Sequence, residues 1–240
     1  MIDPARSFDR AAEEYEAARP DYPIELLDAL PVPPDATVLD LGAGTGKLTR
    51  VLARRYARVI AVEPLDNMRA ILERVVPDAD VYPGSADAIP LGDASVDAVF
   101  AAQAFHWFAT DAAVAEIARV LRPGGIFADV YNDGVEPSPL PSGYQKRIDA
   151  IFAQPRSGAE DDERIAVIER GPFSTMRIVT APHAQVQDRD SVLRFMRSIS
   201  YIAKLPEDER ESTMDELGSL LPEGEYRFPL LATARWATRA

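Results

Sequence analysis

The chain contains no cysteine and only two histidines among its 240 residues. The absence of cysteine excludes disulfide bonds, cysteine-ligated zinc and a cysteine nucleophile, and two histidines argue against a histidine-rich metal site. No apolar run approaches the roughly 20 residues that span a bilayer. The opening residues, MIDPARSFDRAAEEYE, are charged from the third position and lack a basic and then apolar signal. We therefore expect a cytoplasmic protein without a metal ion or a membrane partner.

Positive charge is also scarce. Lysine and arginine together number 26 against 39 acidic residues, for a formal net charge of −13. The arginines are spread along the chain, whereas binding to duplex nucleic acid depends on clustered Lys and Arg. The composition therefore predicts no nucleic-acid partner. It also disfavours an anionic small-molecule substrate unless arginine side chains converge locally, and it leaves the oligomeric state open.

Between residues 37 and 131, apolar runs alternate with amphipathic segments of about ten residues. The pattern predicts helices at 47–56, 67–76 and 111–121, and strands at 37–42, 58–63, 80–84, 96–105 and 126–131. Strands that alternate with helices of this length predict crossover units on a parallel sheet. The strand segments are almost continuously apolar, as is typical of strands covered on both faces.

The flanking regions follow a different pattern. Residues 7–35 predict two helices separated and ended by prolines. After residue 131 we expect loops at 132–143 and 155–164, helices at 144–154, 191–205 and 206–221, and strands at 176–181 and 226–239. The whole is predicted to be an α/β fold with a doubly wound, mostly parallel, seven-stranded sheet. An apolar content of 47% is sufficient for one domain with elaborations.

The stretch DLGAGTG, from Asp40 to Gly46, places three glycines in five positions at the end of the first strand. A phosphate-binding P-loop would need Ser or Thr after Gly46 and Lys47, and Leu48 stands there. A dinucleotide fingerprint would need a glycine at Lys47, and acidic Asp40 would repel a pyrophosphate. Both phosphate-binding interpretations are therefore disfavoured.

A third interpretation fits the acidic residues around the turn. Glu63 ends the second strand and could accept hydrogen bonds from both hydroxyls of a ribose. Asp40 precedes the turn and would lie near an ammonium group. The arrangement suits a nucleoside that carries a cationic amino-acid tail.

With these motifs the chain resembles the class I S-adenosylmethionine-dependent methyltransferases. The resemblance lies in VLDLGAGTG, VIAVEPLDNM, GSADAIPLGDASVDAVFAAQAFHW and RVLRPGG, in this order, across roughly residues 37–130. The chain is most similar to a bacterial branch that also has the motif F-D-x-x-A-x-x-Y-x-x-x-R-P-x-Y-P, here residues 8–23, and AQAFHWF, here residues 102–108. Five motifs in order are a strong signal, although each alone is weak.

The resemblance implies S-adenosylmethionine as the cofactor and assigns roles to individual residues. Gly42, Gly44 and Gly46 would pass under the methionine part beside Asp40, and Glu63 would bind the ribose. Around the adenine and the methionine tail the implied contacts are Pro64, Met68, Ser85, Ala86, Asp87 and Gln103. Ser85 departs from the acidic residue that is frequent in the family, so either its hydroxyl or Asp87 would replace that contact. Tyr15 and Arg19 would bind the cofactor carboxylate as part of a lid.

The resemblance also implies a division of the single domain 1–240. Residues 1–34 would form the helical lid, residues 35–133 the cofactor-binding core, and residues 134–240 an acceptor-site insertion with the terminal strands. We predict methyl transfer to an O or N atom of a small molecule, with His106 as the candidate general base. The alternative interpretation is that His106 only lines the pocket. Alternative functions are a non-catalytic cofactor-binding module and, less favoured, an NAD-dependent oxidoreductase.

Overall fold

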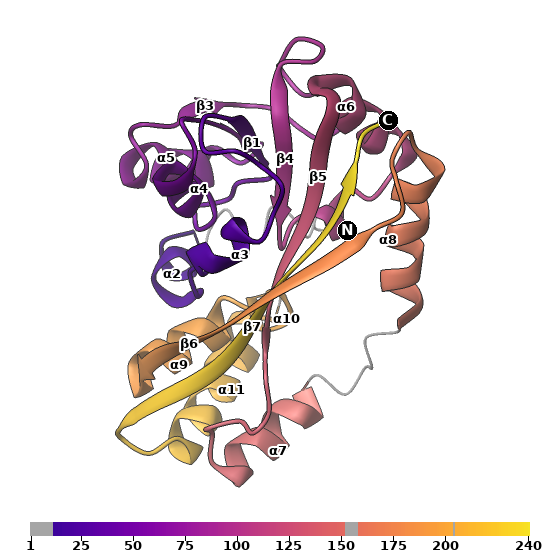
Figure 1. Cartoon of the computed structure of the whole chain (residues 1–240). Helices are drawn as coiled ribbons and strands as arrows, with labels where there is room; N and C mark the ends of the chain where they lie inside the picture. The colour runs from indigo at the N-terminus through magenta and orange to yellow at the C-terminus, as the bar shows by residue number, and fades with distance from the viewer. Residues whose placement is uncertain (1–11, 152–157, 204) are drawn as a thin grey trace. The chain divides into compact units, whose positions relative to one another are not determined.

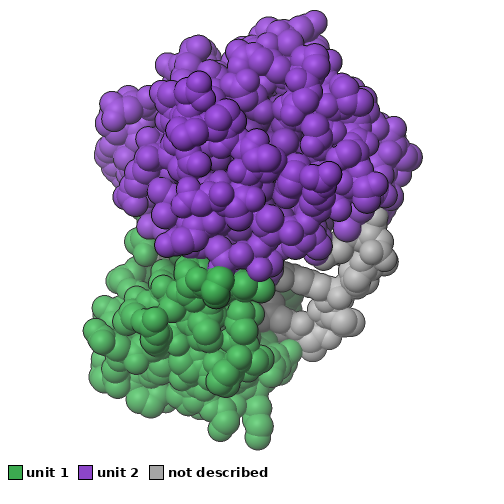
Figure 2. All heavy atoms as spheres, viewed as in Figure 1, with its two compact units in different colours: residues 1–20, 134–156, 182–231 green, residues 21–133, 157–181, 232–240 purple. Residues whose placement is uncertain are grey.

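The computed structural model describes residues 12–151, 158–203 and 205–240. The chain divides into two compact units, shown in Figure 2. Unit 1 comprises residues 1–20, 134–156 and 182–231, and unit 2 comprises residues 21–133, 157–181 and 232–240. Each unit is therefore assembled from three segments that are distant in the sequence.

A seven-stranded sheet with the order β3-β2-β1-β4-β5-β7-β6 organises the fold (Figure 1). Its strands are β1 (Thr37–Leu41), β2 (Arg58–Val62), β3 (Asp80–Tyr82), β4 (Val96–Ala102), β5 (Leu121–Gly134), β6 (Arg177–Asp188) and β7 (Glu225–Thr238). The pairs among β1 to β5 are parallel. The Arg239 N–H donates to the Gly125 carbonyl and the Gly124 N–H to the Arg239 carbonyl, the reciprocal pattern of an antiparallel pair. The predicted α/β sheet is confirmed, and it is mixed rather than fully parallel.

Helices cover both faces of the sheet in unit 2. They are α3 (Ile24–Asp28), α4 (Thr49–Arg55), α5 (Asp66–Val75), α6 (Asp111–Val120) and α8 (Gly158–Arg170). Successive strand residues point to opposite faces. Accordingly, Phe100 belongs to the apolar cluster that includes α3 and α4, and its neighbour Val99 belongs to the cluster that includes α6 and α8. This double cover explains the continuously apolar strand sequences.

Unit 1 has its own apolar cluster. Its helices are α2 (Ala12–Ala18), α7 (Ser142–Ile151), α9 (Arg189–Arg197), α10 (Ser200–Ala203) and α11 (Glu207–Leu220). Tyr144 is fully buried in a cluster with Met196, Met214 and Leu217. Arg189 donates to the carbonyls of Gly218 and Leu221, at 2.8 Å each, which ties α9 to the end of α11. No helix in the described residues is long and apolar enough to cross a membrane.

Three sequence-based expectations about secondary structure are wrong. The loop expected over 155–164 is helical from Gly158 on, because Val167 and Ile168 at the far end of α8 are buried and stabilise the whole helix. The single helix expected over 191–205 is divided into α9 and α10. The strand expected to reach residue 105 ends at Ala102, and Phe105 begins the short 3₁₀ helix η1 (Phe105–Trp107).

Candidate functional site

The three-glycine turn leaves β1 at the carboxyl edge of the parallel strands, where ligands bind in open α/β sheets. Gly42, Gly44 and Gly46 have φ angles of +71°, +57° and +93°, the left-handed region that favours glycine. The Gly42 N–H donates to the Val62 carbonyl at 2.8 Å. The turn is thereby fixed against the end of β2.

Gly44 and Gly46 have different surroundings. A Cβ on Gly44 would meet no described atom within 4 Å, whereas a Cβ on Gly46 would lie 2.6 Å from Cδ1 of Leu72 on α5. A Cβ on Gly42 would lie 3.0 Å from Ala104 and 3.3 Å from Phe108, so the turn also packs against the AQAFHWF segment. Open space therefore lies beside Gly44, while Gly46 serves helix packing.

Glu63 is almost completely buried, 5% exposed, directly after β2. Its Oε2 accepts from the Gly44 N–H at 2.8 Å and its Oε1 from the Leu65 N–H at 2.9 Å. Arg69 donates to the Glu63 carbonyl at 2.9 Å. The backbone N–H groups thus orient the carboxylate toward the glycine turn, and a carboxylate accepts up to about four hydrogen bonds.

Asp40 is buried, 1% exposed, and its Oδ2 accepts from the Thr49 hydroxyl at 2.7 Å. Burial, with a smaller contribution from the nearby charge of Glu63, raises the pKa of Asp40 to about 7, although the Thr49 hydrogen bond opposes this rise. Within the described residues, Oδ1 of Asp40 and the hydroxyl oxygen of Thr45 are buried and have no hydrogen-bond partner. Buried polar atoms are normally hydrogen-bonded, so these two atoms at the turn are candidates for contact with a ligand.

These observations test whether the residues fit S-adenosylmethionine. A cationic group would satisfy Asp40, ribose hydroxyls would donate to Glu63, and the space at Gly44 would admit a ligand close to the backbone. Sequence reasoning missed Thr45 and Thr49, whose signal was their place within and just after the glycine turn. The described residues contain no group of three His, Asp or Glu that could hold a metal ion.

The residues assigned to the adenine lie near the ends of β2 and β3. Pro64 is exposed and Met68 is buried, on the segment that begins α5. Ser85 forms an isolated antiparallel bridge with Ala88, and Ala86 between them is buried. Asp87 is exposed and accepts from the Thr110 hydroxyl at 3.4 Å.

The segment after β4 carries Gln103 and His106. Gln103 has a φ of +49°, which is rare for a residue with a side chain and is typical of strained functional positions. Its N–H donates to the Val130 carbonyl at 2.8 Å and its side-chain amide to the Asn132 carbonyl at 3.3 Å. His106 is exposed, and the centroid of its ring lies 4.9 Å from that of Trp107. In the sequence, the buried Phe105 precedes this pair and the partly buried Phe108 follows it.

The proposed lid residues belong to unit 1, whereas the glycine turn belongs to unit 2. The Arg19 guanidinium lies over the Phe195 ring of α9, 4.8 Å from its centroid. Tyr15 lies in α2, but its side chain is outside the described residues, as are residues 8–11 of the opening motif. The assignment of Tyr15 and Arg19 to the cofactor carboxylate stays a prediction.

The doubly wound sheet, the glycine turn and the buried acids define a Rossmann-like enzyme that binds a nucleoside-bearing ligand. A family model described as a methyltransferase domain matches residues 39–128. An uncharacterised methyltransferase-like protein of Schizosaccharomyces pombe is 35% identical over 228 residues, which cover 90% of this chain and 88% of the relative. The chain therefore belongs to the class I methyltransferase family, and its cofactor is S-adenosylmethionine.

Two further comparisons extend this result. A malonyl-[acyl-carrier protein] O-methyltransferase of Geobacter sulfurreducens is 32% identical over 221 residues, which cover 82% of this chain and 78% of the relative. The solved structure of a candidate type II methyltransferase from Anaeromyxobacter dehalogenans matches with a TM-score of 0.66 at 24% identity, covering 92% of this chain and 97% of that one. The structural match supports the fold alone.

Proposed function

We propose that the protein transfers a methyl group from S-adenosylmethionine to an oxygen or nitrogen atom of a small molecule. The observation that carries the proposal is the junction of Glu63 with Gly44, beside the unsatisfied Oδ1 of Asp40. Glu63 offers acceptors for the ribose hydroxyls, Gly44 leaves space for a ligand beside the backbone, and Asp40 is a buried acid that can pair with an ammonium group. Nothing in this turn is arranged for phosphate.

The ribose, the adenine and the methionine chain of the cofactor have candidate contacts in unit 2. Glu63 binds the ribose, and Pro64 and Met68 pack against the adenine. Gln103 lines the methionine region, at the strained end of β4. The adenine edge is recognised by Ser85, Ala86 and Asp87. Tyr15 and Arg19 of unit 1 hold the carboxylate of the methionine tail.

The cofactor supplies an activated methyl group on a sulfonium, and the residues of the chain supply position and electrostatics. In-line placement alone contributes on the order of 7–11 kcal/mol to such a displacement. A general base matters only where the acceptor must lose a proton. We assign this base role to His106, because Ala104 and Phe108 on either side of η1 pack against Gly42 and the His106 side chain between them in the sequence is exposed.

Replacing His106 by alanine should lower turnover about 100-fold for an acceptor that loses a proton, since a positioned base contributes about 10²–10⁴-fold. The affinity for S-adenosylhomocysteine should not change. His183→Ala, at the half-buried second histidine, is the matched control. Steady-state kinetics measures the turnover of both variants, and calorimetry measures their affinity for S-adenosylhomocysteine. Unchanged turnover in His106→Ala would show that His106 only lines the pocket.

Asp40 makes cofactor binding dependent on pH. Its pKa is about 7 without ligand, and an ammonium group nearby favours the ionised carboxylate. Binding at pH 6 should therefore release a proton, and the affinity for S-adenosylhomocysteine should rise about tenfold between pH 5.5 and 7. Calorimetry in two buffers of different ionisation enthalpy counts the released protons. Asp40→Asn should bind weakly and without this dependence, and wild-type binding that releases no proton would refute the assignment.

The acceptor is proposed to carry an anionic group. Arg164 of α8 and Arg235 of β7 converge on the Tyr131 ring of β5, with their guanidinium carbons 5.1 and 5.8 Å from its centroid. Gln103 bonds to the carbonyls on both sides of Tyr131, so this basic cluster adjoins the methionine end of the site. The convergence meets the condition under which an acidic protein accepts an anionic substrate.

The Geobacter relative, named for O-methylation of malonyl-[acyl-carrier protein], supports oxygen as the methylated atom. We propose that residues 1–240 form a single methyltransferase domain, with residues 1–34 as the lid, residues 35–133 as the cofactor-binding core and residues 134–240 as the acceptor-site insertion and terminal strands. The direct experiment is transfer of labelled methyl from S-adenosylmethionine into a fractionated extract, with anionic and uncharged fractions assayed separately. Label in the anionic fraction supports the proposal, whereas cofactor binding without any transfer would favour a non-catalytic binding module.

A further inference from the structure

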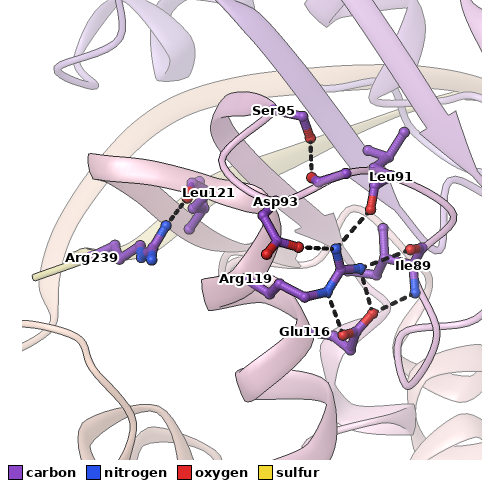
Figure 3. Close-up of polar contacts among 9 residues, drawn as sticks. Ile89, Leu91, Asp93, Ser95, Glu116, Arg119, Leu121 and Arg239 are labelled. Atoms are coloured by element: carbon purple, nitrogen blue, oxygen red, sulfur yellow. Dashed lines mark hydrogen bonds and ion pairs between the residues drawn. The ribbon is translucent and has the colours of Figure 1, made fainter.

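The segment between β3 and β4 carries Ser85, Ala86 and Asp87 but, apart from the Ser85–Ala88 bridge, has no regular secondary structure. Its conformation must therefore be held by other contacts. Figure 3 shows that these contacts converge on Arg119, in the last turn of α6. Neither Arg119 nor its partner Glu116 is among the residues that the motifs assign to the cofactor.

All five N–H donors of the Arg119 guanidinium are used. Its Nε and Nη2 donate to the two carboxylate oxygens of Glu116 at 2.6 and 2.8 Å. The remaining donors bind the carbonyl of Ile89 at 3.0 Å, the carbonyl of Leu91 at 2.7 Å and the carboxylate of Asp93 at 2.9 Å. Glu116 also accepts from the Ile89 N–H at 2.9 Å. Glu116 and Arg119 together thus hydrogen-bond to the N–H and the carbonyl of Ile89 and to the carbonyl of Leu91.

Pro90 connects these hydrogen bonds to the Ser85–Asp87 segment. The two carbonyls that Arg119 binds, on Ile89 and Leu91, flank this proline. A Cβ on Gly84 would lie 2.8 Å from Pro90 and 3.1 Å from Val62, so the proline ring packs on Gly84 and Gly84 packs on the end of β2. Gly84 directly precedes Ser85. The buried Ile89 belongs to the same apolar cluster as Ala86.

Helix α6 does not depend on this pair for its own stability. Thr110 caps its first turn by accepting from the Ala113 N–H at 3.1 Å, and five of its side chains are buried. The side chains of Glu116 and Arg119 are 23% and 31% exposed, and an ion pair this accessible adds only about 0–1 kcal/mol to folding. The bonds of the pair to Ile89 and Leu91 instead fix the backbone of a segment that has no regular secondary structure.

We propose that Glu116 and Arg119 are positioning residues that fix the Ser85–Asp87 segment for the adenine ring. They set the affinity and the base selectivity for the cofactor without contacting it. This inference rests on the proposed function, because it takes the adenine contacts of Ser85, Ala86 and Asp87 from it.

The test compares Arg119→Gln with Arg122→Gln. Arg122 makes bonds of the same kind, to Asp97 at 2.5 Å and to the Ser95 carbonyl at 2.9 Å, but at the far end of the segment. Arg119→Gln should weaken binding of S-adenosylhomocysteine about tenfold, which corresponds to about 1.4 kcal/mol. It should raise the KM for S-adenosylmethionine more than it lowers kcat. Arg122→Gln should leave both quantities within about twofold of wild type.

Base selectivity separates positioning from a general loss of stability. Wild type should prefer S-adenosylhomocysteine over its hypoxanthine analogue, and this preference should shrink in Arg119→Gln and in Glu116→Gln but not in Arg122→Gln. An unchanged preference, or failure of both Arg119→Gln and Glu116→Gln to fold, overturns the inference. If wild type binds no S-adenosylhomocysteine, the proposed function itself fails, and the inference fails with it.

Discussion

Replacing Glu63 by glutamine should weaken the binding of S-adenosylhomocysteine by about 100-fold or more. Each oxygen of Glu63 accepts one backbone N–H, from Gly44 or Leu65, and we propose that the ribose hydroxyls donate to the same carboxylate. Hydrogen bonds to a charged group contribute about 1.5–3 kcal/mol each. Two such bonds to the ribose therefore account for a change of this size.

The amide of glutamine also creates a conflict that alanine would not. Its NH₂ group must face either the Gly44 N–H or the Leu65 N–H, and two donors then point at each other. Glu73→Gln is the matched control, because Glu73 is exposed on α5 and the charge change is identical. Calorimetric titration of both variants with S-adenosylhomocysteine is the measurement. Equal affinity in Glu63→Gln and Glu73→Gln would show that Glu63 serves only the turn.

Valine at Gly44 and valine at Gly46 should have opposite effects. Gly44→Val should fold but lose measurable cofactor binding, because its side chain would occupy the open space beside Glu63. A Cβ on Gly44 has no described atom within 4 Å, so the substitution does not clash with the protein itself. The cost to folding is about 1–2 kcal/mol for a left-handed backbone conformation at φ +57°.

Gly46→Val should be strongly destabilised. A Cβ there lies 2.6 Å from Leu72 and 3.3 Å from Val76, both buried side chains. Overpacking adds about 1–3 kcal/mol to the backbone cost, and the sum is a large part of a typical folding free energy of about 5–15 kcal/mol. Thermal unfolding measures stability, and titration with S-adenosylhomocysteine measures binding. A folded Gly44→Val with wild-type affinity would place the ligand elsewhere, and a stable Gly46→Val would refute the packing role.

Much of the fold follows from the sequence because doubly covered strands impose a local pattern. The segments at 37–42 and 58–63 are mostly apolar, and each is followed by an amphipathic helix. The start of α8 could not be predicted in the same way. Its first turn is rich in acidic residues and carries no apolar periodicity, whereas Val167 and Ile168, further along the helix, pack into an apolar cluster with distant strands.

The site divides along the same line. The glycines, Asp40 and Glu63 are adjacent to strand ends, so their proximity follows from the parallel order of β1 and β2. The pKa of Asp40 is raised by burial, and Gly46 is required for the packing of the turn against α5. Both depend on tertiary contacts, which the local sequence pattern does not show. Glu116 and Arg119 lie three residues apart in a predicted helix, so the sequence indicates that they are neighbours on its surface. Their bonds to Ile89 and Leu91 depend on a tertiary contact.

The central claim is that the turn from Gly42 to Gly46, with Glu63 and Asp40, binds the nucleoside and amino-acid parts of S-adenosylmethionine. Calorimetric titration of the whole protein with S-adenosylmethionine, S-adenosylhomocysteine and NAD tests it most directly. We expect both sulfur-containing ligands to bind with a stoichiometry of about one, and NAD not to bind. Binding of NAD alone would contradict the claim.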